Sequence, residues 1–157
     1  MPAIASLTAQ VQELHARIYP ALFKTNVSTS DLEDVARQYL RENSQRVLVA
    51  QRAGVIVGYA RLEVQHRPET MIKFTRAQLY IHEFGVALHA RASGVGTALV
   101  AHIKDIAREE GIRRIGVDVF VGNEEARHFY ESRGFAAERE VRWLIAPEQG
   151  ESDTPVL

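Results

Sequence analysis

The chain of 157 residues contains no cysteine. This absence excludes a disulfide framework, a thiolate metal site and a cysteine nucleophile, and it is compatible with a reducing compartment. Long apolar runs are also missing, because no stretch reaches the roughly 18 residues of a membrane span. The N-terminus lacks the charged-then-apolar pattern of a signal peptide. We therefore expect a cytoplasmic protein without a membrane partner.

An excess of charge of one sign is missing as well. Nineteen Lys and Arg residues balance 20 Asp and Glu residues, and the formal net charge is −1. Nucleic-acid binding usually requires a clustered basic surface, and no basic run occurs, so a nucleic-acid partner is not expected. With 46% hydrophobic residues, a chain of this length suits one domain that buries roughly 70% of its unfolded surface. We expect that domain at 1–146, followed by a disordered polar tail at 147–157.

The first half of the chain predicts helices followed by a hairpin. A short apolar segment at 4–7 is a weak strand candidate, and residues 8–19 have loose helical spacing before Pro20. A second helix is expected to open at Ser30, with acidic residues in its first turn. Two apolar runs within 47–60, separated by a glycine turn, predict a β-hairpin.

The second half predicts alternating strands and helices. A strand is expected at 77–88 and the clearest helix at 94–110, followed by a strand at 115–121. A short helix capped by Asn123 extends to Arg133, and residues 135–145 read as two last strands. A strand–helix–strand unit places its strands parallel with a right-handed crossover. The predicted fold class is therefore mixed α/β.

One turn between a strand and a helix has the composition of an anion site. It reads Arg91-Ala92-Ser93-Gly94-Val95-Gly96. Glycines allow a ligand close to the backbone, and the first N–H groups of a helix are unpaired and favour phosphate. The signatures of a nucleotide-hydrolysing P-loop and of a dinucleotide-binding Rossmann unit do not occur. The alternative is that the glycines only make a tight turn with close helix–strand packing.

Two motifs resemble those of the GCN5-related N-acetyltransferases (the GNAT superfamily). Val86-x-Leu88-x-x-Arg91-x-x-Gly94-x-Gly96 is similar to their acetyl-CoA-binding signature, with Leu88 where proline is usual. Asn123-x-x-Ala126-x-x-Phe129-Tyr130-x-x-x-Gly134-Phe135 is similar to the family's later helix motif. The order of elements also agrees. The resemblance implies the acyl-CoA N-acyltransferase fold, a central mixed but mostly antiparallel sheet flanked by helices.

The resemblance implies a binding site for acetyl-CoA. The CoA pyrophosphate is expected on the backbone amides of the glycine turn, contributed by Ala92, Ser93, Gly94, Val95, Gly96 and Thr97. Arg91 adds a charged donor, and the main chain of Val86 pairs with the pantetheine arm as an added strand would. Asn123 is expected to cap its helix and to touch the pantetheine. A family bulge in the preceding strand is expected near Gly85.

Catalytic roles follow from the chemistry of amide formation, which requires an acid for the departing thiolate and a base for the amine. Tyr130 resembles the family's general acid, with a core aromatic as the alternative. Glu83 is the favoured base and His82 the second candidate, although strand alternation sends neighbours to opposite faces unless a bulge intervenes. The alternative for Glu83 is a carboxylate that holds a bulge, and many relatives use a water chain as base.

The acceptor is less defined. In this superfamily, segments corresponding here to 19–30 and 66–76 wall the acceptor site. Their weakly cationic composition favours an acceptor bearing a carboxylate, such as an amino acid or peptide, over a polycation. The expected activity is acetyl transfer to a primary amine of a small molecule, peptide or protein by direct attack in a ternary complex.

Three further expectations concern partners and alternatives. The six histidines are scattered along the chain, so no metal site is expected. Homodimerisation is an open alternative, with Val141, Trp143, Leu144 and Ile145 as an apolar edge or as part of the core. The second functional hypothesis is a non-catalytic acyl-CoA-binding or regulatory module on the same fold.

Overall fold

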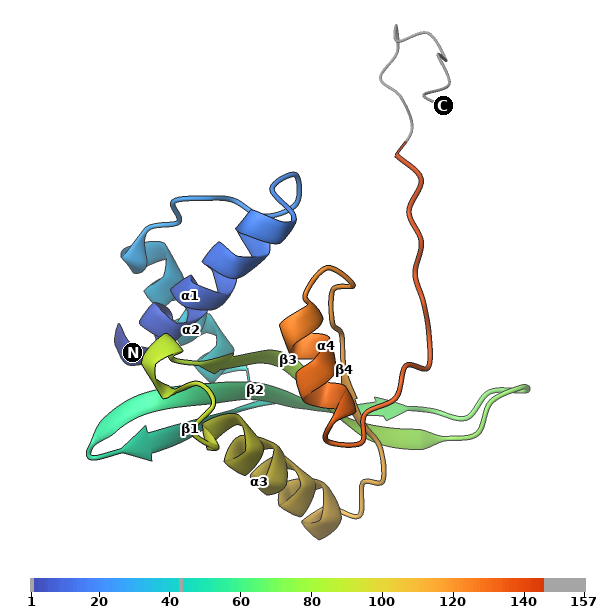
Figure 1. Ribbon diagram of the computed structural model, residues 1–157. Helices are drawn as coiled ribbons and strands as arrows, with labels where there is room; N and C mark the ends of the chain where they lie inside the picture. The colour runs from blue at the N-terminus through green and yellow to red at the C-terminus, as the bar shows by residue number, and fades with distance from the viewer. Residues whose placement is uncertain (1, 43, 146–157) are drawn as a thin grey trace, which may run out of the picture.

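A four-stranded sheet forms the centre of the protein in the computed structural model, which describes residues 2–42 and 44–145 (Figure 1). The strand order is β1-β2-β3-β4, in which β1 to β3 are antiparallel neighbours and β4 runs parallel to β3. The strands are β1 (Gln45–Arg52), β2 (Val55–Arg67), β3 (Arg76–Val86) and β4 (Ile115–Val117). The predicted mixed, mostly antiparallel sheet is confirmed.

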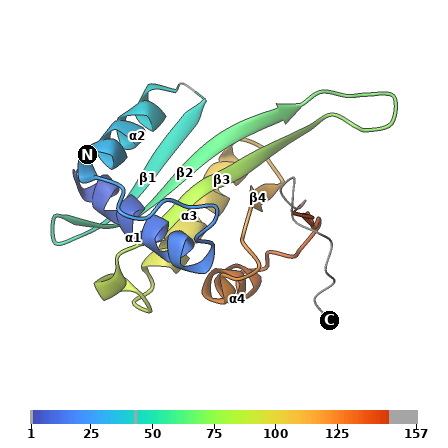
Figure 2. The same cartoon turned by 90° about the horizontal axis from the view of Figure 1, so that it is seen from above.

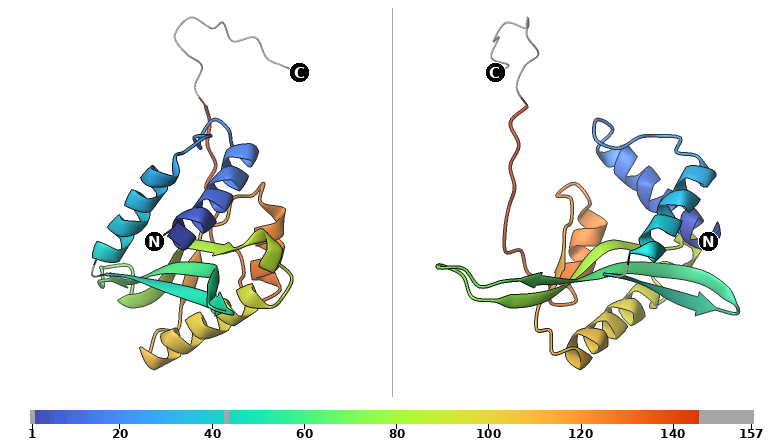
Figure 3. Two further views of the ribbon diagram at one scale, coloured as in Figure 1. Left: turned by 90° about the vertical axis from the view of Figure 1, so that its left-hand side faces the viewer. Right: turned by 180° about the vertical axis from the view of Figure 1, so that it is seen from behind.

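Helices cover both faces of this sheet. Two N-terminal helices lie on one face and α3 lies on the other, while α4 stands beside the β3–β4 end of the sheet (Figure 3). The helices are α1 (Pro2–Ile18), α2 (Thr29–Arg41), the short 3-10 helix η1 (Leu88–Ala90), α3 (Val95–Glu109) and α4 (Glu124–Glu131). Among the residues described, no helix has both the length and the apolar character to span a membrane.

The N-terminal segment is helical from Pro2, so the predicted strand at 4–7 is wrong. Ile4, Leu7 and Val11 repeat at intervals of three and four, which continues the helical stripe of the following residues. Proline is well tolerated in the first turn of a helix. The second helix begins close to its predicted start, with Ser28 as N-cap accepting a hydrogen bond from the Asp31 N–H at 3.1 Å.

The predicted hairpin and bulge are both present, but the bulge is not at Gly85. On β3, Glu83 pairs with Arg61 while Ile81 pairs with Leu62, so His82 is the extra residue. Gly85 has a different role, because a Cβ there would lie 2.7 Å from Cε1 of the Tyr59 ring. The absent side chain leaves room for the Tyr59 ring.

Pairing between β3 and β4 is short. It covers only residues 79–81 and 115–117, so the predicted strand at 115–121 ends four residues early. Beyond it, residues 83–86 of β3 pair with β2, and neither they nor His82 pair with the 118–123 connection, within the described chain. We call this interruption in backbone pairing the β3–β4 gap.

The backbone of Val86 is oriented toward this gap. The Ala87 N–H donates to the Val57 carbonyl at 2.9 Å, which marks these two residues as a hydrogen-bonded antiparallel pair. Hydrogen-bonding directions alternate along a strand, so the N–H and C=O of Val86 point away from β2. An added extended chain in the gap would meet them.

The segment after α4 differs from its prediction. Residues 135–145 form no strand with any part of the described chain, and in Figure 1 the segment runs away from the sheet. Trp143 is 84% exposed and Leu144 94% exposed. The expectation of two last strands is therefore wrong for this segment. The predicted tail at 147–157 lies outside the described residues.

Close helix–sheet packing fixes the start of α3. A Cβ at Gly58 on β2 would lie 2.9 Å from Cγ1 of Val95, the first residue of the helix. Val95 and Leu99 are buried in one core cluster with Tyr59, and Ile103 is buried in a second with Tyr130. The position of the glycine turn before α3 is therefore set by the packing of Val95 against Gly58 of β2.

Candidate functional site

The glycine turn leaves the N-terminus of α3 open. Gly94 is its N-cap at φ +85°, no side chain of the described residues caps the helix, and a Cβ on Gly94 would meet nothing within 4 Å. Ala92 also has a positive φ, of 55°. The amides of Val95, Gly96 and Thr97 belong to the first turn and lack helical acceptors. This geometry suits an anion that approaches along the helix dipole.

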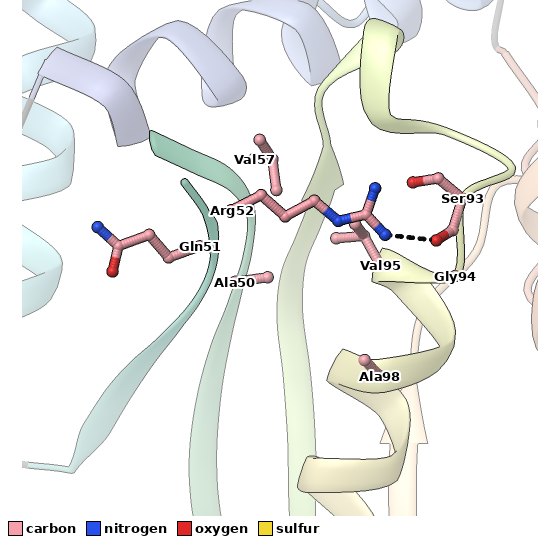
Figure 4. Close-up of a pocket in the computed structure, with 8 residues that line it drawn as sticks. All are labelled: Ala50, Gln51, Arg52, Val57, Ser93, Gly94, Val95 and Ala98. Carbon is pink, nitrogen blue, oxygen red and sulfur yellow. Dashed lines mark hydrogen bonds between the residues drawn. The ribbon is translucent and has the colours of Figure 1, made fainter. Parts of the chain in front are cut away.

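A shallow pocket of about 200 Å³ lies beside this turn (Figure 4). Its walls come from the β1–β2 hairpin and the start of α3, through Ala50, Gln51, Arg52, Val57, Ser93, Gly94, Val95 and Ala98. Arg52 spans the pocket and donates from Nη2 to the Ser93 carbonyl at 2.6 Å. The Ser93 hydroxyl donates to the Ala90 carbonyl at 2.5 Å. Both bonds hold the turn in place.

Helix α4 is attached to the other side of the same turn. A Cβ at Gly96 would lie 2.8 Å from Cε2 of Phe129, so this glycine provides room for an aromatic ring. The Arg133 guanidinium stacks over that ring at 3.7 Å and donates to the Thr97 hydroxyl at 2.6 Å. Gly96 thus allows α3 and α4 to pack closely, whereas Gly94 faces open space.

Arg91 connects three elements. Its Nη1 donates to Glu125 of α4 at 3.1 Å, and its Nε donates to the Val86 carbonyl at 3.3 Å. The main chain of Val86 was expected to bind the pantetheine arm. Its carbonyl already accepts this bond from Arg91, so its N–H is the group that remains for the pantetheine. Asn123, 8% exposed, caps α4 as predicted, because its Oδ1 accepts from the Ala126 N–H at 3.1 Å.

Tyr130 lies at the β3–β4 gap. It is 7% exposed, and its ring packs edge-on against Phe84 of β3 with centroids 5.9 Å apart. None of the hydrogen bonds among the described residues uses its hydroxyl. Burial raises the pKa of Tyr130 above its ordinary value, so the phenol stays protonated and able to donate.

Glu83 is held by β2. It accepts from the Tyr59 hydroxyl at 2.9 Å and forms an ion pair with Arg61 at 3.3 Å. Thr8 of α1 bonds the same Tyr59 hydroxyl at 3.1 Å. Burial, and secondly the charge of Glu83, raise the pKa of Tyr59. The carboxylate is thus anchored by a bonded network on the α1 face of the sheet.

His82 also turns toward β2. Its Nε2 lies 2.7 Å from Glu63 Oε2, and its ring packs edge-on against Tyr80. Hydrogen bonds from Gln65 and then from His82 lower the pKa of Glu63. The hydrogen-bond partners of both predicted bases therefore lie on β2, away from β4.

Four rings adjoin the gap from the α1 face. Tyr19 and Phe23 belong to the segment 19–30 that was expected to wall the acceptor site, whereas His15 and Phe120 were not part of the predicted site. His15, Tyr19 and Phe23 contact Phe120 of the β4–α4 connection, with centroids 4.9 to 5.4 Å apart. We call them the aromatic cluster. Burial lowers the pKa of His15, an effect that the charge of Glu83 opposes. In the sequence, the one signal for the position of His15 was its helical spacing from apolar residues of α1 that are buried.

Known proteins are similar to this chain in sequence. The model of the acetyltransferase (GNAT) family matches residues 8–135. The 5-NmdU N-acetyltransferase of Pseudomonas phage PaMx11 is 36% identical over 94 residues, which are 59% of each chain. Probable N-acetyltransferase family 8 member 5 of Mus musculus is 27% identical over 123 residues. The chain spans 52% of the length of this mouse protein and 59% of the length of the phage protein.

Two solved structures share the fold. A tetramutant of the BH1408 protein from Bacillus halodurans has a TM-score of 0.84 at 23% identity, covering 92% of both chains. Aminoglycoside N-acetyltransferase AAC(6')-Iy in complex with CoA has a TM-score of 0.63 at 16% identity, covering 89% of this chain and 88% of its own. At these identities the likeness shows the fold alone. With the glycine turn, the strand divergence and the α4 motif in register, and with a family model matching most of its length, this chain belongs to the acetyltransferase (GNAT) family.

Proposed function

We propose that the protein is an N-acetyltransferase that moves the acetyl group of acetyl-CoA to a primary amine by direct attack in a ternary complex. One observation carries the proposal. Phe129 fills the space above Gly96, so the open helix N-terminus at Gly94 and the hydroxyl-bearing Tyr130 belong to one packed unit beside the β3–β4 gap.

The residues present fit a CoA thioester. Gly94 leaves open space where a side chain would stand, and the first amides of α3 are free of helical acceptors. We assign the pyrophosphate to the amides of residues 92–97 and the pantetheine to the Val86 N–H. Acetyl-CoA supplies an activated acetyl group when bound. Arg91 then supports the site by holding α4 against the turn, and Asn123 supports it by capping α4.

Tyr130 is assigned as the proton donor to the departing sulfur. Its ring contacts Phe84, in the part of β3 that does not pair with β4. Its raised pKa keeps the proton on the hydroxyl until a thiolate develops nearby. Glu83 is assigned to the amine side, where its negative charge favours an approaching ammonium. Its bonds to Tyr59 and Arg61 hold it in place.

The acceptor is proposed to be a small amine or a peptide. Similar proteins are named for different acceptors, among them 5-NmdU and aminoglycosides, so no acceptor carries over by name. The β2–β3 connection presents exposed Met71, Ile72 and Phe74 beside basic residues. The basic residues of this connection support an acceptor with at most a modest positive charge.

A thiol-release assay tests the activity. Purified protein with acetyl-CoA and a panel of amino acids, peptides and small amines is expected to release CoA thiol and to form an N-acetyl product by mass spectrometry. The alternative is a non-catalytic acyl-CoA-binding module. Acetyl-CoA binding without product from any amine would favour that module, whereas absence of binding would exclude both.

We propose a homodimer as the alternative to a monomer that the sequence left open. Its surface would be the exposed apolar segment that includes Trp143 and Leu144, which no described residue covers. Light scattering is expected to give twice the chain mass for the wild-type protein and the single mass for Trp143→Arg. A monomeric wild-type protein would contradict it.

A further inference from the structure

A histidine of α1 lies over the β3–β4 gap. Val11, His15 and Ile18 are spaced by four and three residues, so they share one helical face. Val11 Cγ2 is 3.2 Å from the position of a Cβ at Gly85 on β3, and Ile18 Cγ2 is 2.8 Å from that of a Cβ at Gly122. His15 stands between these two contacts.

The path of α1 supports this placement. Figure 2 shows the helix crossing the sheet with its C-terminal end toward the β4–α4 connection. There the Gly122 N–H donates to the Tyr19 hydroxyl at 2.8 Å. The His15 ring itself packs 5.4 Å from Phe120 in the same connection. The helix is thus fixed on both sides of the gap, with the imidazole between them.

The surroundings of His15 favour the neutral form of its imidazole. Phe23 of the α1–α2 connection and Phe120 of the β4–α4 connection contact it, and burial lowers its pKa. Glu83 of β3 is the charged group that acts on it, and Arg61 of β2 neutralises part of that carboxylate's charge. Tyr59 of β2 bonds Glu83 and stays protonated because burial and Glu83 raise its pKa. A neutral imidazole has a free nitrogen for a proton.

We propose that His15 is the base that removes a proton from the acceptor ammonium, in a site whose aromatic cluster receives the apolar portion of a mono-amine. The proposal rests on the proposed acetyltransferase function. Glu83 has the role of an electrostatic partner, because its own oxygens are engaged by Tyr59 and Arg61.

The proton balance is complete without another reactant. The ammonium gives one proton to His15, and the amine nitrogen then forms its bond to the acetyl carbon as the carbon–sulfur bond breaks. The sulfur takes a proton from the Tyr130 hydroxyl, which is replenished by the second proton leaving the nitrogen. His15 returns its proton to water, so each turnover from an ammonium releases one proton.

The first test needs no acceptor. Histidine ring signals are followed by NMR during pH titration, with and without saturating acetyl-CoA, and His15 is assigned from the His15→Gln variant. We expect the His15 signal to shift with acetyl-CoA and its pKa to lie below the usual 6.5, while exposed His102 on α3 does not respond. An unmoved His15 signal in CoA-bound protein, or a His15 that is protonated at pH 7, would overturn the proposal.

The second test uses a matched pair of amines, 2-phenylethylamine and its 2,2-difluoro analogue, whose ammonium is more acidic. His15→Gln should lower kcat/KM by about 10²-fold for the first amine and by much less for the second, which loses its proton to water readily. His102→Gln is the control. An equal loss for both amines would make His15 structural, and Glu83→Gln reproducing the amine-dependent loss while His15→Gln does not would transfer the role to Glu83.

Failures of the two proposals are distinguishable. Wild-type protein that binds acetyl-CoA and acetylates other amines but not 2-phenylethylamine would contradict the apolar acceptor. Protein that binds no acetyl-CoA by calorimetry would overturn the acetyltransferase function, and the role of His15 with it.

Discussion

Phe129 of α4 occupies the space that a side chain at Gly96 of α3 would fill, with Cε2 only 2.8 Å from the position of that Cβ. This contact joins the two family motifs, which lie more than 25 residues apart in sequence. Tyr130 follows Phe129 directly, and its ring packs 5.2 Å from that of Phe129. The helix that holds the proposed proton donor is therefore positioned by the glycine turn that is proposed to hold the CoA pyrophosphate.

Adding a methyl group at Gly96 should disturb this alignment. Gly96→Ala is expected to destabilise the protein by about 1–3 kcal/mol through overpacking and to lower turnover, because α4 must move. In the Phe129→Leu background the same change should cost less, since the ring is gone. Chemical denaturation of the four proteins measures the coupling. Fully additive effects would mean that Gly96 and Phe129 do not contact each other in solution.

Removing the Tyr130 hydroxyl should affect chemistry and not binding. Tyr130→Phe is expected to slow kcat by about 10- to 10³-fold, because the thiolate then leaves without a positioned proton donor. Acetyl-CoA affinity, measured by calorimetry, should stay within about twofold. The hydroxyl makes no bond to a described residue, so stability should change little. Unchanged turnover would remove Tyr130 from the proposed mechanism.

Gly94 and Gly111 make a matched pair at opposite ends of α3. Both have positive φ, at 85° and 67°, and both would place a Cβ in open space. Alanine at either position should therefore cost a similar amount of stability, about 1 kcal/mol. Only Gly94→Ala is expected to weaken acetyl-CoA binding, because its Cβ stands at the open helix N-terminus. Equal acetyl-CoA affinities of the two variants would place the cofactor elsewhere.

The half-buried imidazole of His15 should make folding stability dependent on pH. Its folded-state pKa lies below the unfolded value of 6.5, so the unfolded chain binds the proton first. The contribution is fully present above pH 6.5 and is lost as the pH falls through that value toward the lower folded-state pKa. His15→Gln should therefore flatten the loss of stability between pH 7 and pH 5.

Thermal unfolding of wild-type protein, His15→Gln and His102→Gln over that range measures the effect. The pKa of Glu63 is lowered from 4.5, so its contribution to stability is lost mainly below pH 5. It therefore contributes little to the change between pH 7 and pH 5. If wild-type protein and His15→Gln lose stability in parallel from pH 7 to pH 5, His15 is not desolvated as described.

Local signals predicted most of the elements. Asn123 as a cap, glycine at a turn of the hairpin and the apolar stripe of α3 each act within a few residues, and all three are present in the structure. The error at 4–7 arises because a four-residue apolar run does not distinguish strand from helix. The helical spacing of Ile4 and Leu7 is recognisable only when Val11 is included.

Features that depend on distant partners could not be predicted. The bulge at His82 is defined by its register with Arg61 and Leu62, and the early end of β4 by its divergence from β3. Residues 135–145 contain apolar residues suited to a strand, but a strand also needs a neighbour, and the described residues provide none. Arg52 bonds Ser93 across 41 positions, and the place of His15 follows only from the path of α1 over the sheet.

Thermal unfolding with and without acetyl-CoA, with adenosine as control, tests the central claim most directly. Ligand at about 100 times its dissociation constant adds roughly 2.7 kcal/mol, which for a chain of this size raises the Tm by about 5–10 °C. The predicted result is this shift with acetyl-CoA, no shift with adenosine, and a reduced shift in Gly94→Ala but not in Gly111→Ala. No shift at saturating acetyl-CoA would contradict the assignment of the glycine turn as a cofactor site.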